Sequence, residues 1–362
     1  MDLRSLPRPF TRADARAAGL SRRGLDEALR LGTVTRRDHG WFEMAHRDPE
    51  PECEEWQRTI ADHLERLHHE LRKRPGMIAS HSSAGVAGGM AVVISPDSPV
   101  ELTDIDGCQR SWRGDGVIVH HADSTDTPYT VVDGIRVTVD PRTVADIART
   151  RTLPHGVATI DDVLRSGRVS EHEILDVLDQ QRRWVGRPRA LVAMELKDPR
   201  RESWLESYSD VRLYQSGVPL PLVQVSIFDA DRRFVARVDG LDPELGVFRE
   251  ADGQAKYLLD VDAHTTAEES VLGRLAAEQE RHGRLEALGL RGFRWSTTQI
   301  RTEPDEVAGR WKTLSQAPVP PISGYAEWQG ELRPLPFAVE RREIDLSKAR
   351  TSRRQSRERY WF

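Results

Sequence analysis

Three carboxylates lie close together in the chain between Asp239 and Asp252, in an order that suits a metal site. The run FVARVD alternates apolar and polar residues up to Asp239, as a half-buried strand does, and Pro243 then interrupts it. In a second short strand, GVFREAD, Glu250 and Asp252 are two residues apart, so both side chains should point to one face. Like charges at close range repel each other unless a cation neutralises them, and Mg²⁺ prefers oxygen ligands. The pattern therefore predicts that Asp239 and Glu250 bind Mg²⁺.

A magnesium site of this kind favours the hydrolysis of phosphodiesters. Ions held by Asp239 and Glu250 would lower the pKa of a bound water and stabilise the charge that develops in the transition state. Lys256 would neutralise a phosphate or a developing charge. Glu206, on a predicted helix, would approach the metal from the side, or else form a capping box with Ser203. The alternative for the acidic residues is a polar sheet end beside a turn, and for Lys256 a surface lysine.

The order of Asp, ten residues and Glu-x-Asp resembles the PD-(D/E)xK nuclease core, with Asp252 where that family usually has lysine. Several further segments follow the order seen in actinobacterial relatives of the very-short-patch-repair endonucleases. These segments are ESWLES at 202–207, QSGVPLP at 215–221, EADGQAKY at 250–257 and RLEALGLRGFRW at 284–295.

The resemblance implies a restriction-endonuclease-like fold and a Mg²⁺-dependent deoxyribonuclease. Its catalytic residues would be Glu206, Asp239, Glu250, Asp252 and Lys256. This chain departs from those relatives at two places. The first acid is followed by Gly240 instead of phenylalanine, and the helical Glu-Lys pair is replaced by Glu278-Gln279. Each departure is of a kind that would reduce or abolish cleavage.

The start of the chain predicts two short helices and a hairpin. Thr11 lies three residues before Asp14 in a capping-box pattern, and Gly19 can end this first helix. Ser21 can cap SRRGLDEALRLG, which carries an apolar stripe, and TVTRRDHGWFEM suits a hairpin that turns at 38–40. Helix, tight turn, helix and hairpin together predict a winged helix-turn-helix.

This segment is locally basic. Residues 1–42 contain nine arginines and five acidic residues, although the whole chain has a net charge of −5. The residues expected to contact DNA are Arg22 and Arg23, which open the second helix, and Arg36 and Arg37, which lie on the wing. The alternatives are that exposed arginines merely solvate short helices, or that the winged domain docks on a protein.

The pattern AGLSRRxLDxxLRxGxxxRxxxGxF closely resembles the N-terminal domain of the abortive-infection E-type antitoxins (AbiEi), over about forty residues. The phrases SHSSA, VxVHHA and GIRVTxxxRTVADIAR also recur in the middle region of those proteins. In that family the middle region is associated with toxin neutralisation or docking, so the resemblance implies a toxin or other protein partner, and a role in phage defence.

The histidines of the middle region give weaker signals. His120 and His121 are adjacent on a predicted strand and therefore point to opposite faces, which argues against joint chelation. The run His81-Ser82-Ser83 is more typical of a helix cap than of a nucleophile beside its base. The histidines His63, His68 and His69, on a predicted helix, are expected to be solvated surface residues.

With 362 residues the chain exceeds the usual size of one core, so several domains are expected. Charged residues are 31% of the total, and any nucleic-acid signature is therefore local. Two cysteines, Cys53 and Cys108, are too few for a disulfide framework or a zinc cluster and suit a reducing cytosol. There is no apolar run near the roughly 20 residues that span a bilayer, and no signal-peptide core. We expect a cytoplasmic protein without a membrane partner.

The expected fold class is α/β (α+β), multidomain. The expected domains are a winged helix-turn-helix at 1–46, a linker and helix at 47–75, an antitoxin-like middle domain at 76–184, a restriction-endonuclease-like domain at 185–301, and a Pro-containing linker and basic tail at 302–362. The leading hypothesis is a protein that binds duplex DNA and carries a Mg²⁺-dependent endonuclease-like domain, in which Arg281 and Arg284 of a long helix contact the DNA backbone. The alternative is a non-enzymatic type IV antitoxin or transcriptional repressor with a vestigial nuclease fold.

Overall fold

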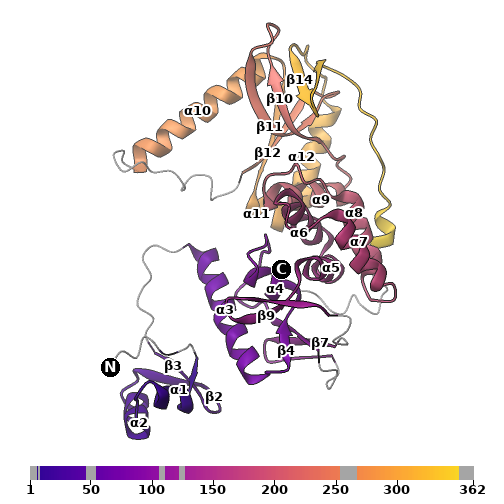
Figure 1. The fold of residues 1–362 in the computed structure, drawn as a ribbon. Coiled ribbons are helices and arrows are strands. Elements are labelled where there is room, and N and C mark those ends of the chain that lie inside the picture. The colour runs from indigo at the N-terminus through magenta and orange to yellow at the C-terminus, as the bar shows by residue number, and fades with distance from the viewer. Residues whose placement is uncertain are drawn as a thin grey trace. The chain divides into compact units, whose positions relative to one another are not determined.

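The computed structural model describes residues 6, 9–45, 54–105, 111–121, 127–252 and 267–349, with side chains from 276 onward in the last segment. These residues form a mixed α/β protein with three sheets (Figure 1), which confirms the expected class at that level. The chain divides into two compact units, one within residues 1–143 and the other within 144–360. Among the described residues, no helix is long and apolar enough to cross a membrane.

The first unit begins with two short helices and a three-stranded sheet of order β1-β3-β2. The Thr11 hydroxyl accepts from the Asp14 N–H while Asp14 accepts from the Thr11 N–H, as a capping box requires, and Ser21 caps the second helix. These caps and the hairpin turn confirm the local predictions. The elements are β1 (Phe10–Thr11), α1 (Arg12–Ala17), α2 (Arg22–Arg30), β2 (Val34–Asp38) and β3 (Trp41–Met44).

A six-stranded sheet of order β6-β7-β5-β4-β9-β8 makes up the rest of the first unit. Central strand β5 pairs antiparallel with β4 and parallel with β7. Leu67 of α3 packs with Leu102 and Val119 in the core. The elements are α3 (Glu55–Lys73), β4 (Met77–Ala79), α4 (His81–Ala87), β5 (Val100–Asp104), β6 (Trp112–Gly114), β7 (Val117–His121), β8 (Tyr129–Val132) and β9 (Ile135–Thr138).

Five helices follow: α5 (Asp140–Thr150), α6 (Leu153–Arg165), α7 (Glu171–Gln180), α8 (Arg187–Leu196) and α9 (Trp204–Gln215). The buried guanidinium of Arg201 donates to Asp161 of α6 and Asp210 of α9, at 2.9 Å in each case. This pairing ties α6 to α9. The second unit begins at residue 144, so residues 144–184 belong to it instead of the middle domain expected there. Helical periodicity shows that α6 and α7 are amphipathic, but it does not show which unit covers their apolar faces.

The second unit contains a six-stranded sheet of order β13-β12-β11-β10-β14-β15. Strands β10, β11, β12 and β14 of this sheet are labelled in Figure 1. Strands β10, β11 and β12 form an antiparallel series, and β13 lies parallel to β12. The elements are β10 (Leu222–Phe228), β11 (Phe234–Asp242), β12 (Val247–Asp252), α10 (Ala267–Ala287), β13 (Arg291–Ser296), α11 (Thr297–Thr302), α12 (Pro304–Gln316), β14 (Tyr325–Trp328), β15 (Glu331–Pro334) and the 3₁₀ helix η4 (Leu346–Ala349).

Residues 304–334 differ from the linker expected there. Trp311 of α12 is buried against Phe293, with 5.2 Å between the ring centroids, and Ala326 of β14 pairs with Ile227 of β10. The Pro-rich segment that suggested a linker is only the connection between this helix and the added strands. The strongly basic end of the tail, from Arg350 onward, lies outside the described residues.

Candidate functional site

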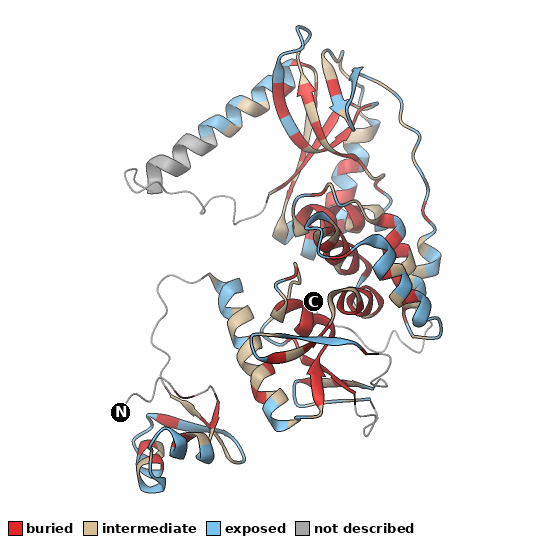
Figure 2. Cartoon of the chain, in the orientation of Figure 1, coloured by how far each residue is buried: buried red, intermediate tan, exposed pale blue. Residues whose placement is uncertain are grey.

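Strand β12 presents its side chains alternately to two apolar cores. Figure 2 shows that the strands of this sheet are largely buried. Val247 and Ala251 pack in the core that includes Trp311, whereas Phe248 packs in the other core and contacts His282 of α10. By this alternation Glu250 and Asp252 share the α10 face, as the sequence predicted.

Glu250 is buried, and arginines neutralise it. Arg281 of α10 donates from its two terminal nitrogens to both carboxylate oxygens, at 2.5 and 2.8 Å. Arg294 of β13 lies 3.5 Å from the same carboxylate, because Glu250 and Arg294 are register partners on parallel strands. A bidentate guanidinium pair is one of the stronger ionic contacts in proteins, so no other cation is needed to balance this buried charge.

Arg294 also binds the neighbouring acids. It donates to both oxygens of Asp252, at 3.2 and 2.6 Å, and it forms a short contact with Glu278 of α10. Burial alone would raise the pKa of Glu278, but the hydrogen bond and charge of Arg294 outweigh burial and lower that pKa. We refer to the five residues of this group as the arginine–carboxylate cluster: Glu250, Asp252, Glu278, Arg281 and Arg294. Arg281, expected to contact DNA, is engaged inside this cluster instead.

Asp239, on β11, lies beside the cluster. Its Oδ2 accepts from the Ala251 N–H at 3.2 Å, so this carboxylate is tied to the backbone of β12 directly after Glu250. The adjacent register pair is Gly240 with Arg249. Asp239 precedes Gly240 and Glu250 follows Arg249, so Asp239 and Glu250 lie next to this pair on neighbouring antiparallel strands.

Glu206 takes part in the N-terminal cap of α9. It accepts from the Ser203 hydroxyl at 2.7 Å and from the Glu202 N–H at 2.9 Å, while Ser203 Oγ accepts from the Glu206 N–H at 3.2 Å. Its carboxylate reaches back one residue further than a capping box would require. It also accepts from the Gln224 amide of β10 at 2.8 Å, which ties this buried helix end to the sheet.

Carboxylates suit Mg²⁺ by their chemistry, but the described arrangement gives them arginine partners. Within the described residues, the one group of three ligand side chains whose donor atoms lie within 4.8 Å of one another is elsewhere, at His81, Glu101 and His120. Lys256 lies outside the described residues. A Mg²⁺ ion at Asp239 and Glu250 would therefore have to displace Arg281 from its carboxylate partner.

The four arginines expected to contact DNA lie on two elements of the first unit. Arg22 and Arg23 are exposed in the first turn of α2, and Arg36 is exposed on β2. None of these three forms an ion pair with another residue in the described part of the chain, whereas Arg37 donates to Glu43 at 2.7 Å. Relative to the residues that the structure describes, three of the four guanidinium groups are therefore available to a polyanion.

The grouping of His81, Glu101 and His120 was not anticipated from the sequence. The alternation along β7 correctly separated His120 from His121, which is exposed. The spacing of residues in the sequence did not predict this group, because His81, Glu101 and His120 lie on α4, β5 and β7. They come together only when β4, which precedes α4, and β7 both pair with β5.

Comparison with models of known protein families gives no match. Two uncharacterized proteins, from two strains of Mycobacterium tuberculosis, are each 27% identical to this chain over 179 residues. The aligned part is 49% of this chain and 61% of each relative. The chain thus spans less than two thirds of the length of these curated relatives.

Proposed function

We propose that this protein binds duplex DNA through residues 9–45. The main support for this proposal is that Arg22 and Arg23 are exposed in the first turn of α2 and have no ion-pair partner among the described residues. The N-terminus of a helix also carries unsatisfied N–H groups and a partial positive charge, both of which favour phosphate oxygens. Arg36 on the adjoining hairpin adds a third available cation.

The arrangement of this segment supports a winged helix-turn-helix. Helix α1 leads through a short turn at Gly19 into α2, and the β2–β3 hairpin follows directly. In such domains the second helix enters the major groove with its first residues nearest the bases, and these are the positions of Arg22 and Arg23. The contacts would be mainly to phosphates, because these give affinity, whereas base contacts give specificity.

For the second unit we propose an endonuclease-like domain. Its support is that Asp239 of β11 and Glu250 of β12 lie next to the Gly240–Arg249 register pair, on neighbouring strands of one sheet. Asp239 and Glu250 on adjoining strands are its proposed metal ligands. The ions would supply the activated water and the charge stabilisation of phosphodiester cleavage.

A second candidate function is a non-enzymatic antitoxin or transcriptional repressor. One observation favours it: Glu250, the more buried of the two proposed ligands, already has both oxygens bonded to Arg281. A domain with this internal neutralisation can serve as a scaffold without a metal. The two candidates share DNA binding and differ in cleavage.

DNA binding is tested by titrating a labelled duplex with the full-length protein over a range of salt concentrations. The double variant Arg22→Ala/Arg23→Ala should bind more weakly and lose about 1.8 from the slope of log K against log salt, at about 0.9 per phosphate contact. Arg30→Ala is the matched control, because Arg30 ends the same helix and lies near Glu27, at 3.7 Å. Equal affinity and slope in the parent and the double variant would refute the proposed interface.

A further inference from the structure

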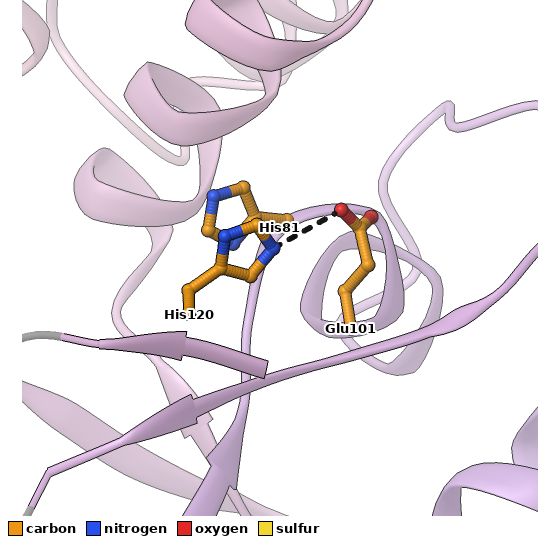
Figure 3. A group of neighbouring side chains, drawn as sticks. All are labelled: His81, Glu101 and His120. Carbon is orange, nitrogen blue, oxygen red and sulfur yellow. Dashed lines mark ion pairs between the residues drawn. The ribbon is translucent and has the colours of Figure 1, made fainter. Parts of the chain in front are cut away.

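A buried carboxylate and two imidazoles converge on one face of the first unit's larger sheet. Glu101 lies on β5 and His120 on the neighbouring parallel strand β7, where the register pairs Thr103 with His120. Because Glu101 and Thr103 alternate to the same face, Glu101 and His120 are diagonal neighbours there. His81 joins them at the start of α4, immediately after β4 (Figure 3).

The separations suit two ligands of one small cation. One donor atom from each residue lies within 4.8 Å of the other two. His120 Nε2 is 3.4 Å from Glu101 Oε1. Two ligand atoms bound tetrahedrally to Zn²⁺, at about 2.0–2.1 Å from the ion, are roughly 3.3 Å apart. The pair of Glu101 and His120 is therefore already spaced as two zinc ligands would be.

Neighbouring groups hold the carboxylate in place. Glu101 Oε2 accepts from the Ser82 N–H at 3.0 Å, and the Glu101 N–H donates to Ser83 Oγ at 2.8 Å. Ser83 Oγ in turn lies 2.9 Å from His63 Nε2, and both are buried, so His63 is not the solvated surface residue that the sequence predicted. In protein metal sites, neighbouring groups regularly form hydrogen bonds with the ligand side chains and hold them in the orientation that binds the metal.

His81 has a strained backbone. Its φ is 51°, in the left-handed region, which is unfavourable for a non-glycine residue. This conformation brings its imidazole onto that of His120, with 3.6 Å between the ring centroids and 18° between the planes (Figure 3). His81 Nδ1 is 3.0 Å from Ser80 Oγ, which positions the ring further. Strain of this kind persists where the surroundings demand it, and it concentrates at functional sites.

We propose that His81, Glu101 and His120 bind one divalent transition-metal ion, of which Zn²⁺ is the best fit. Two imidazoles and one carboxylate form a borderline donor set that favours Zn²⁺ over Mg²⁺, which takes oxygen ligands almost exclusively. The stacked rings must turn about their side-chain torsions so that both nitrogens reach the ion. Three protein ligands leave one coordination position open.

The test is zinc titration of the full-length protein after dialysis against a chelator, with stoichiometry from elemental analysis. The parent should bind one Zn²⁺ at this site, and His120→Ala should bind it at least about tenfold more weakly. His121→Ala is the matched control, because His121 is the next residue on the same strand and is exposed. It should bind zinc as the parent does. Glu101→Gln gives the same test with little change of shape, in case His120→Ala fails to fold.

Cobalt provides a second readout. Co²⁺ bound to the parent should give the visible absorption of a four-coordinate ion, and excess Zn²⁺ should remove it while excess Mg²⁺ should not. Binding should weaken as the pH is lowered, because metal ligands must be deprotonated to bind the ion. A parent that binds no zinc, or equal zinc binding by the parent, His120→Ala and Glu101→Gln, would overturn the proposal and leave a hydrogen-bonded polar cluster. The result is independent of the DNA-binding test.

Discussion

Arg281 of α10 and Glu250 of β12 are joined by two parallel hydrogen bonds, at 2.5 and 2.8 Å. The guanidinium fork matches the two oxygens of the carboxylate, and the pair links the helix to the strand that it covers. The carboxylates were expected to need an external cation because they repel one another. The arginine–carboxylate cluster meets that need from within the chain, so Arg281 decides how available Glu250 is to a metal.

Replacing Arg281 with glutamine should therefore have two effects of opposite sign. It leaves a buried carboxylate without its main partner, which should lower the free energy of unfolding by about 1–3 kcal/mol. It should also raise the affinity for Mg²⁺, seen as a larger increase in melting temperature on adding the ion. Arg284→Gln is the control, because Arg284 is exposed one turn further along the same helix. Equal Mg²⁺ responses of both variants would show that Arg281 does not compete with a metal.

The variant Asp239→Asn distinguishes the nuclease hypothesis from the hypothesis of a non-enzymatic repressor or antitoxin. If Asp239 holds a catalytic ion, removing its charge while keeping its shape should lower the nicking of supercoiled plasmid in Mg²⁺ or Mn²⁺ by orders of magnitude, with DNA binding retained. The assay includes a chelator control. A parent that does not nick DNA, or nicks it no faster than the variant, would support the repressor or antitoxin function instead.

His63 should make stability depend on pH. Burial, assisted by the charge of Arg66, lowers the pKa of His63 to about 4. The unfolded chain takes up this proton near pH 6.5, so between pH 6.5 and 4 the unfolded state binds more protons. The contribution to stability is therefore complete above pH 6.5 and is lost as the pH falls towards 4, by up to about 3 kcal/mol.

Urea unfolding at several pH values measures this effect. In His63→Gln the loss of stability between pH 6.5 and 4 should be smaller than in the parent, whereas His121→Gln, on an exposed residue, should follow the parent. A variant at position 63 with the parent's full pH dependence would show that other groups cause it.

Arg201 is the main ionic link between α6 and α9. Its guanidinium is buried and donates to Asp161 and Asp210, so Arg201→Ala leaves two buried carboxylates without their cation. We expect a loss of about 3–5 kcal/mol in the free energy of unfolding. Arg233→Ala removes the same charge from an exposed pair with Asp231 and should cost at most about 1 kcal/mol. Denaturation midpoints that shift equally in both variants would rule out this role for Arg201.

The sequence by itself determined several local features of this protein. The caps at Thr11 and Ser21, the hairpin that turns at 38–40 and the alternation that puts Glu250 and Asp252 on one face are all present in the structure. Each depends on residues within a few positions of one another, whose hydrogen bonds and side-chain directions follow from backbone geometry alone. For the same reason His120 could be separated from His121.

The tertiary structure alone decided which of these local features meet. Arg281 reaches Glu250 only because α10 returns across the sheet, and Arg294 reaches it because β13 lies parallel to β12. Likewise, Glu101 and His120 become neighbours only through the pairing of β5 with β7. Such contacts join residues far apart in the chain, and they depend on which apolar faces pack together. No local sequence pattern shows which apolar faces pack together. The sequence therefore located the acidic residues but did not show that arginines neutralise them.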